Sequence, residues 1–285
     1  MPMLISMNGV RTPAEAAKLS IFDRGFLFGD AIYEVIATHH GRSPFHLDAH
    51  LDRLERSGAA TGIDVPALRP ALEGEISSLV ADAPGSGELY IRIMITRGES
   101  PGLDLLAGAG PPTWIVMVKP LPAWERRHLE TGVRLLSVRP EEIVGRVAPW
   151  VKSNNRQANV MAHSLARGRG YDDSLFVDPT GNVTEGPSWN VFCVEDGEVV
   201  TPPLERGLLP GITRGLIIGL CAELGIPCRE ALVSLEEARG ADEVFLTSTT
   251  RGVMAVAELD ARPYCGGQTP GPITRRLRDA LLAEK

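Results

Sequence analysis

The sequence predicts an α+β protein of two domains with a cleft between them. Helix and strand patterns are mixed in the first part of the chain, whereas strand patterns dominate the second part. Between these parts, the stretch LPAWERRHLETG breaks the pattern with Pro122 and a cluster of charges, which predicts a linker over residues 121–133. The expected domains are a smaller α/β domain over residues 1–120 and a larger one over 134–285, and small ligands commonly bind in the cleft between two domains.

Each strand is expected where β-branched or aromatic residues are dense and turn residues lie close by. In WNVFCVEDGEVVT, the letters EDGE are typical of a hairpin turn. The predicted strands, in chain order, are AIYEVIATHH (31–40), ELYIRIMITRG (88–98), TWIVMVKPL, SLFVD, WNVFCVEDGEVVT, CREALVSL, ADEVFLTST and GVMAVAEL.

Four segments have the spacing of helices. In HLDAHLDRLERSGAATGI, Leu47, Leu51 and Leu54 recur at helical intervals, and Gly58 or Gly62 is the expected end. The other three predicted helices are PALRPALEGEISSLV, NRQANVMAHSLARGRG and LLPGITRGLIIGLCAELG, the last of which is expected to stop at a glycine.

Composition excludes several classes of protein. A content of 44% hydrophobic and 23% charged residues is ordinary for a soluble globular chain. The net charge of -7 argues against a nucleic-acid partner, and no apolar run is long enough to cross a membrane. The four cysteines form no C-x-x-C pair and no metal spacing, so we expect reduced thiols in the cytoplasm.

His46 and His50 are four residues apart on a predicted helix, which is the spacing of a two-histidine metal site. No glutamate follows the first histidine, and no third ligand is evident. We therefore interpret the pair as part of a solvated helix face and expect no metal.

Lysine is scarce in this chain. Only four of its 29 lysine and arginine residues are lysines, and Lys152 follows the apolar pair Trp150-Val151. Arginine can replace lysine as a generic positive charge, but only a lysine amine can lose its proton and form a Schiff base. A partly desolvated lysine loses that proton more easily, which makes Lys152 a candidate catalytic residue.

Two further features of the second half are compatible with such a lysine. Glu185 lies in a turn between two strands, in GNVTEGPSWNVF, where its charge can face a cationic ligand atom or simply cap the turn. In LLPGITRG, the N–H groups that open a helix form a natural phosphate site, with the Thr213 hydroxyl as an extra donor. A lysine, a carboxylate and an anion site in one domain suggest a phosphorylated aldehyde cofactor such as pyridoxal phosphate.

With these motifs in this order, the chain resembles the class IV aminotransferases, the fold-type IV pyridoxal-phosphate enzymes. The resemblance covers nearly the whole chain and is carried by FDRGFLFGDAIYEVI, HLDRL, YIRIMITRG, VKSNNRQANVMA, GYDDSLFVD, VTEGPSWNVF, LLPGITRG and EVFLTSTTRGVMAV. It implies a homodimer with the active site in the interdomain cleft and a ping-pong transfer of an amino group between an amino acid and a 2-oxo acid.

The resemblance also implies residue roles. Lys152 matches the lysine that forms the Schiff base with the cofactor and later moves a proton between Cα and C4′. Glu185 matches the carboxylate that keeps the pyridine nitrogen protonated, and Tyr33 matches a tyrosine of the substrate pocket. The other cofactor-binding positions that the resemblance implies are Arg53, Ile212, Thr213, Thr249 and Thr250 at the phosphate, and Ser188 and Leu209 near the ring.

Simpler interpretations exist for several of these residues. Taken alone, Arg53 fits a surface arginine, since it sits just off the leucine stripe of its helix. Tyr33 on a strand fits a core residue, and the pair Thr249-Thr250 fits a strand end.

The motifs VKSNNRQANV and TSTT look more like the D-amino acid transaminases than the branched-chain enzymes. The latter usually have a tyrosine five residues after the lysine, where this chain has Gln157. The best-known D-amino acid transaminases also hold the substrate carboxylate with an Arg-x-His pair, but this chain has Gly102 and Asp104 at those positions.

A different arginine is therefore expected to bind the substrate carboxylate, because arginine is the best bidentate partner for it. The candidates are Arg92 in the strand YIRIMI, Arg24 in FDRGF and Arg251 after TSTT, although Arg24 could instead be a structural arginine that holds its loop.

The predicted function is transfer of an amino group from a D-amino acid to 2-oxoglutarate or pyruvate. Two alternatives stay open: a transaminase of (R)-amines or branched-chain L-amino acids, and a lyase of the aminodeoxychorismate type.

Overall fold

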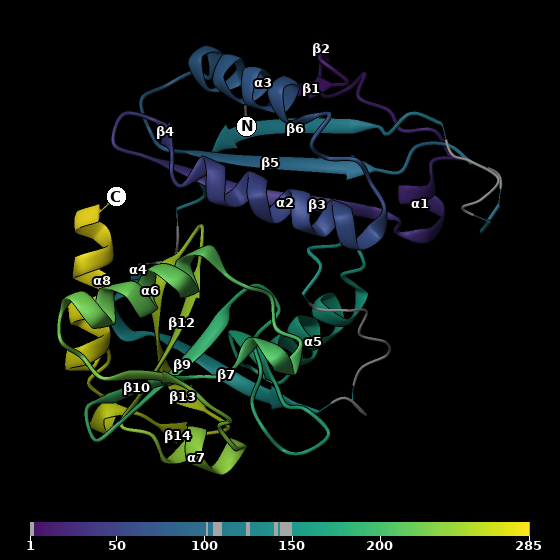
Figure 1. Ribbon diagram of the computed structural model, residues 1–285. Coiled ribbons are helices and arrows are strands. Elements are labelled where there is room, and N and C mark those ends of the chain that lie inside the picture. Colours follow the sequence, from purple (N-terminus) through teal and green to yellow (C-terminus); the bar gives the residue numbers. More distant parts are fainter. Residues whose placement is uncertain are drawn as a thin grey trace. The chain divides into compact units, whose positions relative to one another are not determined.

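Helices and sheets occur in both halves of the protein, as the computed structural model shows (Figure 1). The structure describes residues 3–100, 102–104, 110–123, 126–139, 142 and 150–284. Two compact units divide the chain: unit 1 is Met1–Pro122 with Val151–Asn155, and unit 2 is Ala123–Trp150 with Arg156–Lys285. The predicted α+β class is confirmed, and the segment around Lys152 belongs to unit 1 although it lies inside the range expected for the larger domain.

Unit 1 is built on one antiparallel sheet with the strand order β2-β1-β6-β5-β3-β4. The strands predicted over 31–40 and 88–98 are confirmed as β3 and β5. The elements of unit 1 are β1 (Leu4–Met7), β2 (Val10–Arg11), α1 (Arg24–Phe28), β3 (Ala31–His39), β4 (Ser43–Pro44), α2 (Leu47–Thr61), α3 (Arg69–Asp82), β5 (Leu89–Thr96) and β6 (Trp114–Pro120).

One face of this sheet carries the core of unit 1. Side chains alternate across a strand, so Ile91, Ile93 and Ile95 of β5 point to the same face, where all three are buried. Leu54 of α2 and Ile76 of α3 belong to the same hydrophobic cluster, so both helices cover that face. In Figure 1, α2 lies along β3, and α3 lies near β1 and β6.

The leucine pattern that predicted α2 is confirmed, since Leu51 and Leu54 are buried. The helix ends at Gly62, whose φ of 72° is the left-handed conformation that glycine adopts without strain. Gly58 instead lies inside the helix, where an added Cβ would come within 2.5 Å of the Ile63 carbonyl oxygen.

Unit 2 is built on a mixed sheet with the strand order β11-β10-β9-β12-β13-β7-β8, and β14 pairs with β13. The central strands pair in antiparallel fashion, whereas β10–β11, β13–β7 and β7–β8 are parallel. The elements of unit 2 are α4 (Arg126–Thr131), β7 (Val133–Val138), α5 (Gln157–Gly168), β8 (Asp173–Phe176), β9 (Asn190–Glu195), β10 (Glu198–Thr201), η2 (Leu204–Arg206), α6 (Ile212–Glu223), β11 (Cys228–Glu230), α7 (Leu235–Gly240), β12 (Glu243–Ser248), β13 (Gly252–Leu259), β14 (Arg262–Pro263), η3 (Cys265–Gly267) and α8 (Pro272–Glu284).

Local chemistry explains two connections of unit 2. The predicted hairpin joins β9 to β10 through Asp196 and Gly197, both with positive φ, as a tight two-residue turn requires. Helix α6 packs with α8 over β9 and β12, and Phe192, Ile217 and Leu277 belong to the cluster between them. Figure 1 shows α6 beside α8.

The strand predicted over CREALVSL is largely wrong. Only Cys228–Glu230 forms a strand, and Ser234 begins α7 instead. The Ser234 hydroxyl accepts from the Glu237 N–H, and the Glu237 carboxylate accepts from the Ser234 N–H, which makes a capping box. This local signal outweighs the β-branched character of the segment.

The region of the expected linker contains the short helix α4, and residues 124 and 125 lie outside the described part of the chain. Among the residues that the structure describes, no helix is both long and apolar enough to cross a membrane.

Candidate functional site

Lys152 is anchored to unit 1 by its backbone. The Tyr33 N–H donates to the Lys152 carbonyl at 2.9 Å, and the Asn154 N–H donates to the Ala31 carbonyl at 2.8 Å. The Lys152 N–H donates to the Oγ of Ser57, on α2, at 3.3 Å. The lysine is thus held by a strand and a helix of the same unit, and its own segment extends the sheet beside the start of β3.

Tyr33 contacts two cations. The Lys152 Nζ lies 4.5 Å from the centroid of the tyrosine ring, and the Arg92 guanidinium carbon lies 4.4 Å from it. Contacts of this kind stabilise by about 1 kcal/mol where the cation is partly desolvated. Arg92 also donates to the Asn154 Oδ1 at 3.4 Å. Three residues singled out by the sequence therefore lie together on unit 1, and Tyr33 is buried, as a core residue would be.

Glu34 is fully buried on the opposite face of β3, toward α2. Its carboxylate accepts from the Arg53 Nε at 2.6 Å and Nη2 at 2.8 Å, and it lies 2.9 Å from the Nδ1 of His50. Burial raises the pKa of Glu34, but the charge of Arg53 and the hydrogen bonds from Arg53 and His50 outweigh it and bring the pKa to about 2. Burial also lowers the pKa of His50, so this ring stays neutral near neutral pH.

These contacts correct two interpretations made from the sequence. Arg53 is not a surface arginine, and His50 does not lie on a solvated face, because both are buried against Glu34. A carboxylate inside a sheet needs charged or hydrogen-bonding partners, and α2 supplies them.

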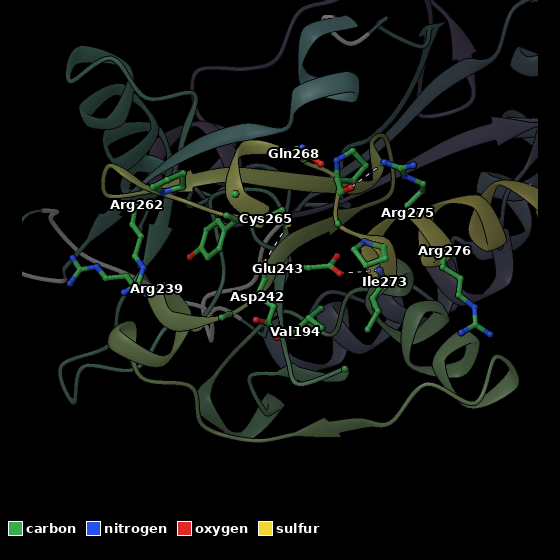
Figure 2. Close-up of a pocket in the computed structure, with 18 of the residues that line it drawn as sticks. Val194, Arg239, Asp242, Glu243, Arg262, Cys265, Gln268, Ile273, Arg275 and Arg276 are labelled. Carbon is green, nitrogen blue, oxygen red and sulfur yellow. Dashed lines mark hydrogen bonds between the residues drawn. The ribbon is translucent and has the colours of Figure 1, made fainter.

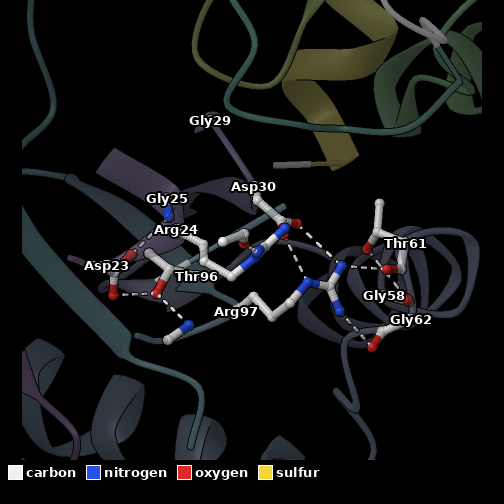
Figure 3. Close-up of polar contacts among 12 residues, drawn as sticks. Asp23, Arg24, Gly25, Gly29, Asp30, Gly58, Thr61, Gly62, Thr96 and Arg97 are labelled. Carbon is white, nitrogen blue, oxygen red and sulfur yellow. Dashed lines mark hydrogen bonds and ion pairs between the residues drawn. The ribbon is translucent and has the colours of Figure 1, made fainter. Parts of the chain in front are cut away.

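Arg24 contacts a different carboxylate of unit 1 (Figure 3). Its Nε donates to the Asp30 Oδ2 at 2.9 Å, and one terminal nitrogen donates to the Gly102 carbonyl. Arg97 donates to the same carboxylate at 2.7 and 3.0 Å. Burial raises the pKa of Asp30, but the hydrogen bonds from Arg97 and Arg24 outweigh it and hold the pKa below its usual value.

These are the contacts expected of an arginine that holds its loop. They connect Arg24 to Gly102, which is one of the two positions where D-amino acid transaminases have the Arg-x-His pair and this chain does not. Of the rest of that loop, Pro101 and residues 105–109 lie outside the described residues.

Glu185 is buried in unit 2 and accepts from the Leu209 N–H at 3.1 Å. Asn190 forms an isolated bridge with Glu185, and its Nδ2 donates to the Leu209 carbonyl at 3.0 Å. Gly211 packs tightly on the same asparagine, since an added Cβ would lie 2.0 Å from its Oδ1. Asn190 therefore links Glu185 to the loop that leads into α6.

Helix α6 begins with Gly211 as its N-cap, and no side chain bonds to the cap. The N–H groups of Ile212 and Thr213 thus belong to a first turn without a capping side chain, and the helix dipole favours an anion at this end. Thr213 itself is buried.

The end of β12 lies next to this helix start, because Thr247 pairs with Asn190 in the sheet. The hydroxyl oxygens of Thr247 and Ser248 are buried without a hydrogen-bond partner among the described residues. Thr249 and Thr250 follow in the turn after the strand. This part of unit 2 therefore offers amide and hydroxyl donors to an anion such as a phosphate.

Arg251, the third candidate for the carboxylate, lies in unit 2. Its guanidinium carbon is 4.2 Å from the ring centroid of Trp189, and its Nη1 is 3.9 Å from the Asp173 Oδ2. Burial lowers the pKa of Arg251, and the charge of Asp173 partly offsets this.

Ser188 is exposed, and it lies in the tight turn that the Gly186 N–H closes by donating to the Trp189 carbonyl at 2.9 Å.

Sequence reasoning missed three polar residues that hold these sites: Glu34, Asn154 and Asn190. A signal for Glu34 exists, since it is a carboxylate among the apolar residues of AIYEVIA. Asn190 likewise opens the apolar run VFCV. Asn154 carries no such signal, because it is one of several polar residues in KSNNRQ.

A separate pocket of about 1080 Å³ lies in unit 2 (Figure 2). Its lining includes Arg262, Cys265 and Glu243, and none of the described lining residues is a predicted site residue. The Glu243 carboxylate accepts from the N–H groups of Ile273 and Thr274 at 2.9 and 2.8 Å and so caps α8. The Glu243 carboxylate therefore has a structural role.

Comparisons with known proteins show the family and the fold of this chain. A family model described as class IV aminotransferase matches residues 31–259. A putative branched-chain-amino-acid aminotransferase of Methanocaldococcus jannaschii is 34% identical, over 97% of this chain and 94% of that protein. A D-alanine aminotransferase of Bacillus licheniformis is 30% identical, over 98% of this chain and 96% of that protein.

A solved structure of a fold IV transaminase from Curtobacterium pusillum superposes with a TM-score of 0.83 at 26% identity, over 100% of both chains. The predicted two-domain fold-type IV architecture is thereby confirmed.

Proposed function

Since this chain belongs to the class IV aminotransferase family, we propose that it moves the amino group of a D-amino acid to a 2-oxo acid, 2-oxoglutarate or pyruvate, by a ping-pong mechanism. Class IV aminotransferases are enzymes that use pyridoxal 5'-phosphate. The D-amino acid preference is supported by Gln157, which stands where branched-chain enzymes usually have a tyrosine, and by the similarity to D-alanine aminotransferases.

Two residues are proposed to do the chemistry with this cofactor. Pyridoxal phosphate supplies an electron sink for the bond that breaks at the substrate Cα. Lys152 would bind the cofactor covalently and would move the proton between Cα and C4′, and its backbone hydrogen bonds with Tyr33 and Ser57 hold the segment that carries its amine. Glu185 keeps the proton on the pyridine nitrogen, while its bond from the Leu209 N–H fixes the orientation of its carboxylate.

The phosphate of the cofactor fits the donors of unit 2. The start of α6, which no side chain caps, favours an anion, and the Ser248 hydroxyl, which has no partner among the described residues, could donate to it. We assign Ile212, Thr213, Thr249 and Thr250 to this phosphate. We also assign Arg53 to it, with Glu34 fixing the plane of the guanidinium, and Ser188 and Leu209 to the neighbourhood of the ring.

The observation that carries the proposed substrate class is the contact of Lys152 and Arg92 with one tyrosine ring. The nitrogen of a substrate amino acid would take the place of the Lys152 amine on the cofactor, and the substrate carboxylate would then lie a few ångströms away, which is the distance scale of this cluster. Arg92 is half-buried, so it can bind a carboxylate with little competition from water. Arg24 is committed to Asp30 and Gly102, so we prefer Arg92 for this role.

A branched-chain L-amino acid is the second candidate substrate. It is favoured by the 34% identity to the putative branched-chain enzyme of M. jannaschii. The contacts of Tyr33 with Lys152 and Arg92 fit the carboxylate of either enantiomer, so the stereochemistry has to be measured.

A panel of half-reactions tests the proposal. The purified enzyme with its cofactor is mixed with D-alanine, L-leucine or (R)-phenylethylamine in the absence of a 2-oxo acid, and the change in cofactor absorbance is followed. We expect D-alanine to react fastest. A faster reaction of L-leucine or of the amine would overturn the D-amino acid proposal in favour of that alternative, and release of pyruvate from aminodeoxychorismate without an acceptor would identify a lyase.

The role of Arg92 is tested with Arg92→Leu and its charge-conserving control Arg92→Lys. We expect the leucine variant to raise the KM for D-alanine roughly ten- to a hundredfold, the cost of one charged hydrogen-bonding partner. (R)-Phenylethylamine has no carboxylate, so its KM should change little. Equal effects on both substrates would mean that Arg92 supports Tyr33 and does not bind the carboxylate.

We further propose that the enzyme is a homodimer in the cytoplasm. The segment before and within α1 exposes large apolar side chains, among them Ile21, Phe22 and Phe26, which are each more than half exposed. An apolar patch of this kind is typical of a protein interface. Sedimentation of the wild type and of Phe26→Glu should give a dimer and a weakened dimer, and a monomeric wild type would refute this point.

A further inference from the structure

Asn154 lies beside Arg92, the arginine proposed above to bind the substrate carboxylate. The Arg92 Nη2 donates to the Asn154 Oδ1 at 3.4 Å, and both residues are half-buried. The amide oxygen has to face the guanidinium, because an arginine and the nitrogen of an amide can both only donate. Asn154 therefore supplies an acceptor that fixes how the guanidinium points.

The pairing of two strands brings Arg92 to this place. In the register of β3 with β5, Tyr33 pairs with Met94, so Arg92 lies two residues along β5 on the same face of the sheet. The core of unit 1, with Ile93, lies on the other face. Arg92 rests with its guanidinium carbon 4.4 Å from the centroid of the Tyr33 ring. A ring on one side and an amide at one end leave the guanidinium few orientations.

The backbone holds Asn154 where it can act on this arginine. Ser153 forms an isolated antiparallel bridge with Ile32 of β3, and Lys152 and Asn154 lie on either side of it in the chain. Residues two apart along an extended segment point to the same side. The Lys152 Nζ is 4.5 Å from the centroid of the Tyr33 ring, so both side chains reach the surroundings of one ring.

The partner of Arg92 is neutral, whereas the two buried arginines of unit 1 bind carboxylates. Arg24 binds Asp30, and Arg53 binds Glu34. Among the residues that the structure describes, no carboxylate lies within ion-pair distance of Arg92. A carboxylate partner would cancel the charge of the guanidinium, but an amide oxygen orients it and occupies only one of its five N–H donors. The charge and enough donors for a bidentate contact thus stay available to a ligand.

We propose that Asn154 is a positioning residue that aims the guanidinium of Arg92 at the substrate carboxylate and leaves its charge uncancelled. The binding of that carboxylate by Arg92 belongs to the proposed function, on which this inference rests. Together the two residues make the site select amines that carry a neighbouring carboxylate. Asn154→Leu removes the acceptor, and Asn154→Asp supplies a carboxylate that competes with the substrate, so the second change should weaken substrate binding more than the first.

Both variants are tested in the enzyme with its cofactor. The dissociation constant of propionate, a carboxylate without an amine, is measured by calorimetry, and KM and kcat are measured with D-alanine. Asn154→Leu should raise the propionate constant and the KM roughly three- to tenfold, the effect of one lost hydrogen bond. Asn154→Asp should raise both more than tenfold, by roughly as much as Arg92→Leu. The kcat should change by less than about twofold, since the lost interaction binds substrate and transition state alike.

Asn155 provides the matched control in the same segment. It is exposed, and its Nδ2 donates to the Gly29 carbonyl at 3.3 Å. Asn155→Leu and Asn155→Asp should leave the propionate constant and the KM unchanged. The dissociation constant of pyridoxal phosphate, measured by equilibrium dialysis, should stay the same in all four variants, whereas a general distortion of the segment that carries Lys152 would raise it.

The proposal is overturned if Asn154→Leu and Asn154→Asp leave propionate binding unchanged, or if they weaken cofactor binding as much as propionate binding. A wild-type enzyme that does not bind propionate would overturn it as well. If L-leucine reacts and D-alanine does not, the proposed D-amino acid function fails. The order of the two variants in propionate binding still decides the role of Asn154 in that case, because propionate has no stereocentre.

Discussion

Glu34 of unit 1 and Glu185 of unit 2 are both buried carboxylates, but different groups hold them in place. In unit 1, side chains hold the buried carboxylate: Glu34 is bound by the charged Arg53 and by the His50 ring inside the core. In unit 2, the backbone holds the carboxylate: Glu185 is fixed by the Leu209 N–H, and Asn190 fixes the Leu209 carbonyl in turn. Unit 1 should therefore be sensitive to the loss of a charge or to pH, whereas unit 2 should be sensitive to the volume of small residues.

The two means have different energetic costs. Burying an ion pair costs the solvation free energy of both charged groups. When one partner is removed, the charge that is left in the core strongly destabilises the fold. A carboxylate that accepts from a backbone N–H keeps its position as long as the loop that carries this N–H keeps its conformation. Its position should therefore change when the loop shifts, and it should not change when a charge elsewhere is removed. Four experiments test this difference, and the largest effect is expected from the first.

The largest effect is expected for Lys152→Arg. Arginine stays protonated and can neither bind the cofactor covalently nor accept the proton from Cα, so the rate of transamination should fall roughly a thousandfold or more. The rate with D-alanine and 2-oxoglutarate and the absorption spectrum of the bound cofactor are the measurements.

Lys119→Arg is the matched control, because Lys119 also lies over a tyrosine ring of unit 1, with its Nζ 4.9 Å from the centroid of Tyr90. The control should keep full activity. If Lys152→Arg retained a covalently bound cofactor, or if the control lost as much activity, the assignment of Lys152 would fail.

The second largest effect is expected for Glu34→Gln. The change leaves Arg53 buried without its counter-charge, so the free energy of unfolding should fall by about 3 kcal/mol. Urea denaturation at neutral pH measures it.

Glu73→Gln removes a carboxylate that bonds Arg69 at 2.9 Å on the exposed surface of α3, and it should cost less than about 1 kcal/mol. Equal losses for Glu34→Gln and Glu73→Gln would show that burial of the ion pair does not set its importance.

The third largest effect is expected for Gly211→Ala in unit 2. The added Cβ would come 2.0 Å from the Asn190 Oδ1, so the asparagine and the loop before α6 must shift. We expect the dissociation constant of pyridoxal phosphate to rise about tenfold, which corresponds to about 1.4 kcal/mol. Equilibrium dialysis of the enzyme with its cofactor gives this constant without an activity assay.

Gly215→Ala is the matched control on the same helix, since nothing lies within 4 Å of a Cβ there. It should bind the cofactor normally and raise the melting temperature slightly, because alanine favours the helix more than glycine. In an Asn190→Ala background, Gly211→Ala should raise the dissociation constant of pyridoxal phosphate less than it does in the wild type. Full additivity of the two changes would contradict the proposed effect of Gly211→Ala through Asn190.

The smallest effect concerns pH. Burial lowers the pKa of His50 from its ordinary 6.5, so the unfolded chain takes up this proton first and stability declines as the pH falls through 6.5. The pKa of Glu34 is about 2 in the fold against an ordinary 4.5, so stability is lost again as the pH falls from 4.5 toward 2. Both shifts act in the same direction.

The free energy of unfolding, measured by urea denaturation between pH 6.5 and 4.5, should fall less steeply in His50→Gln than in the wild type. A slope identical to that of the wild type would mean that His50 titrates in the fold as it does in the unfolded chain.

Some elements of both units could be predicted from the sequence, and others could not. Periodicity predicted β3, α2 and β5 within a few residues, because an apolar face repeats at a fixed interval in each of them. It failed at CREALVSL, where Ser234 and Glu237 start a helix by local hydrogen bonds that a count of β-branched residues ignores. It also placed His50 on a solvated face, because nothing in α2 itself signals a carboxylate on β3.

Lys152 and Glu185 were singled out by residue type and by the motifs around them, since a reactive amine and a fixed carboxylate are chemical requirements that a short motif can carry. Their surroundings were decided by tertiary structure alone. Tyr33 and Arg92 meet because β3 and β5 pair in one register. The Lys152 segment joins unit 1 because its carbonyl accepts from a strand that precedes it in the chain by more than a hundred residues.

From the sequence alone, the class of fold and the cofactor could be predicted, and both are confirmed, whereas the roles of Lys152 and Glu185 stay predictions. Which of three arginines lies beside Tyr33 and Lys152, and which carboxylate each of the others contacts, followed from the tertiary structure. The physical reason is that composition and periodicity record local preferences, whereas the partner of a charge depends on which distant segments the packing of the core brings together.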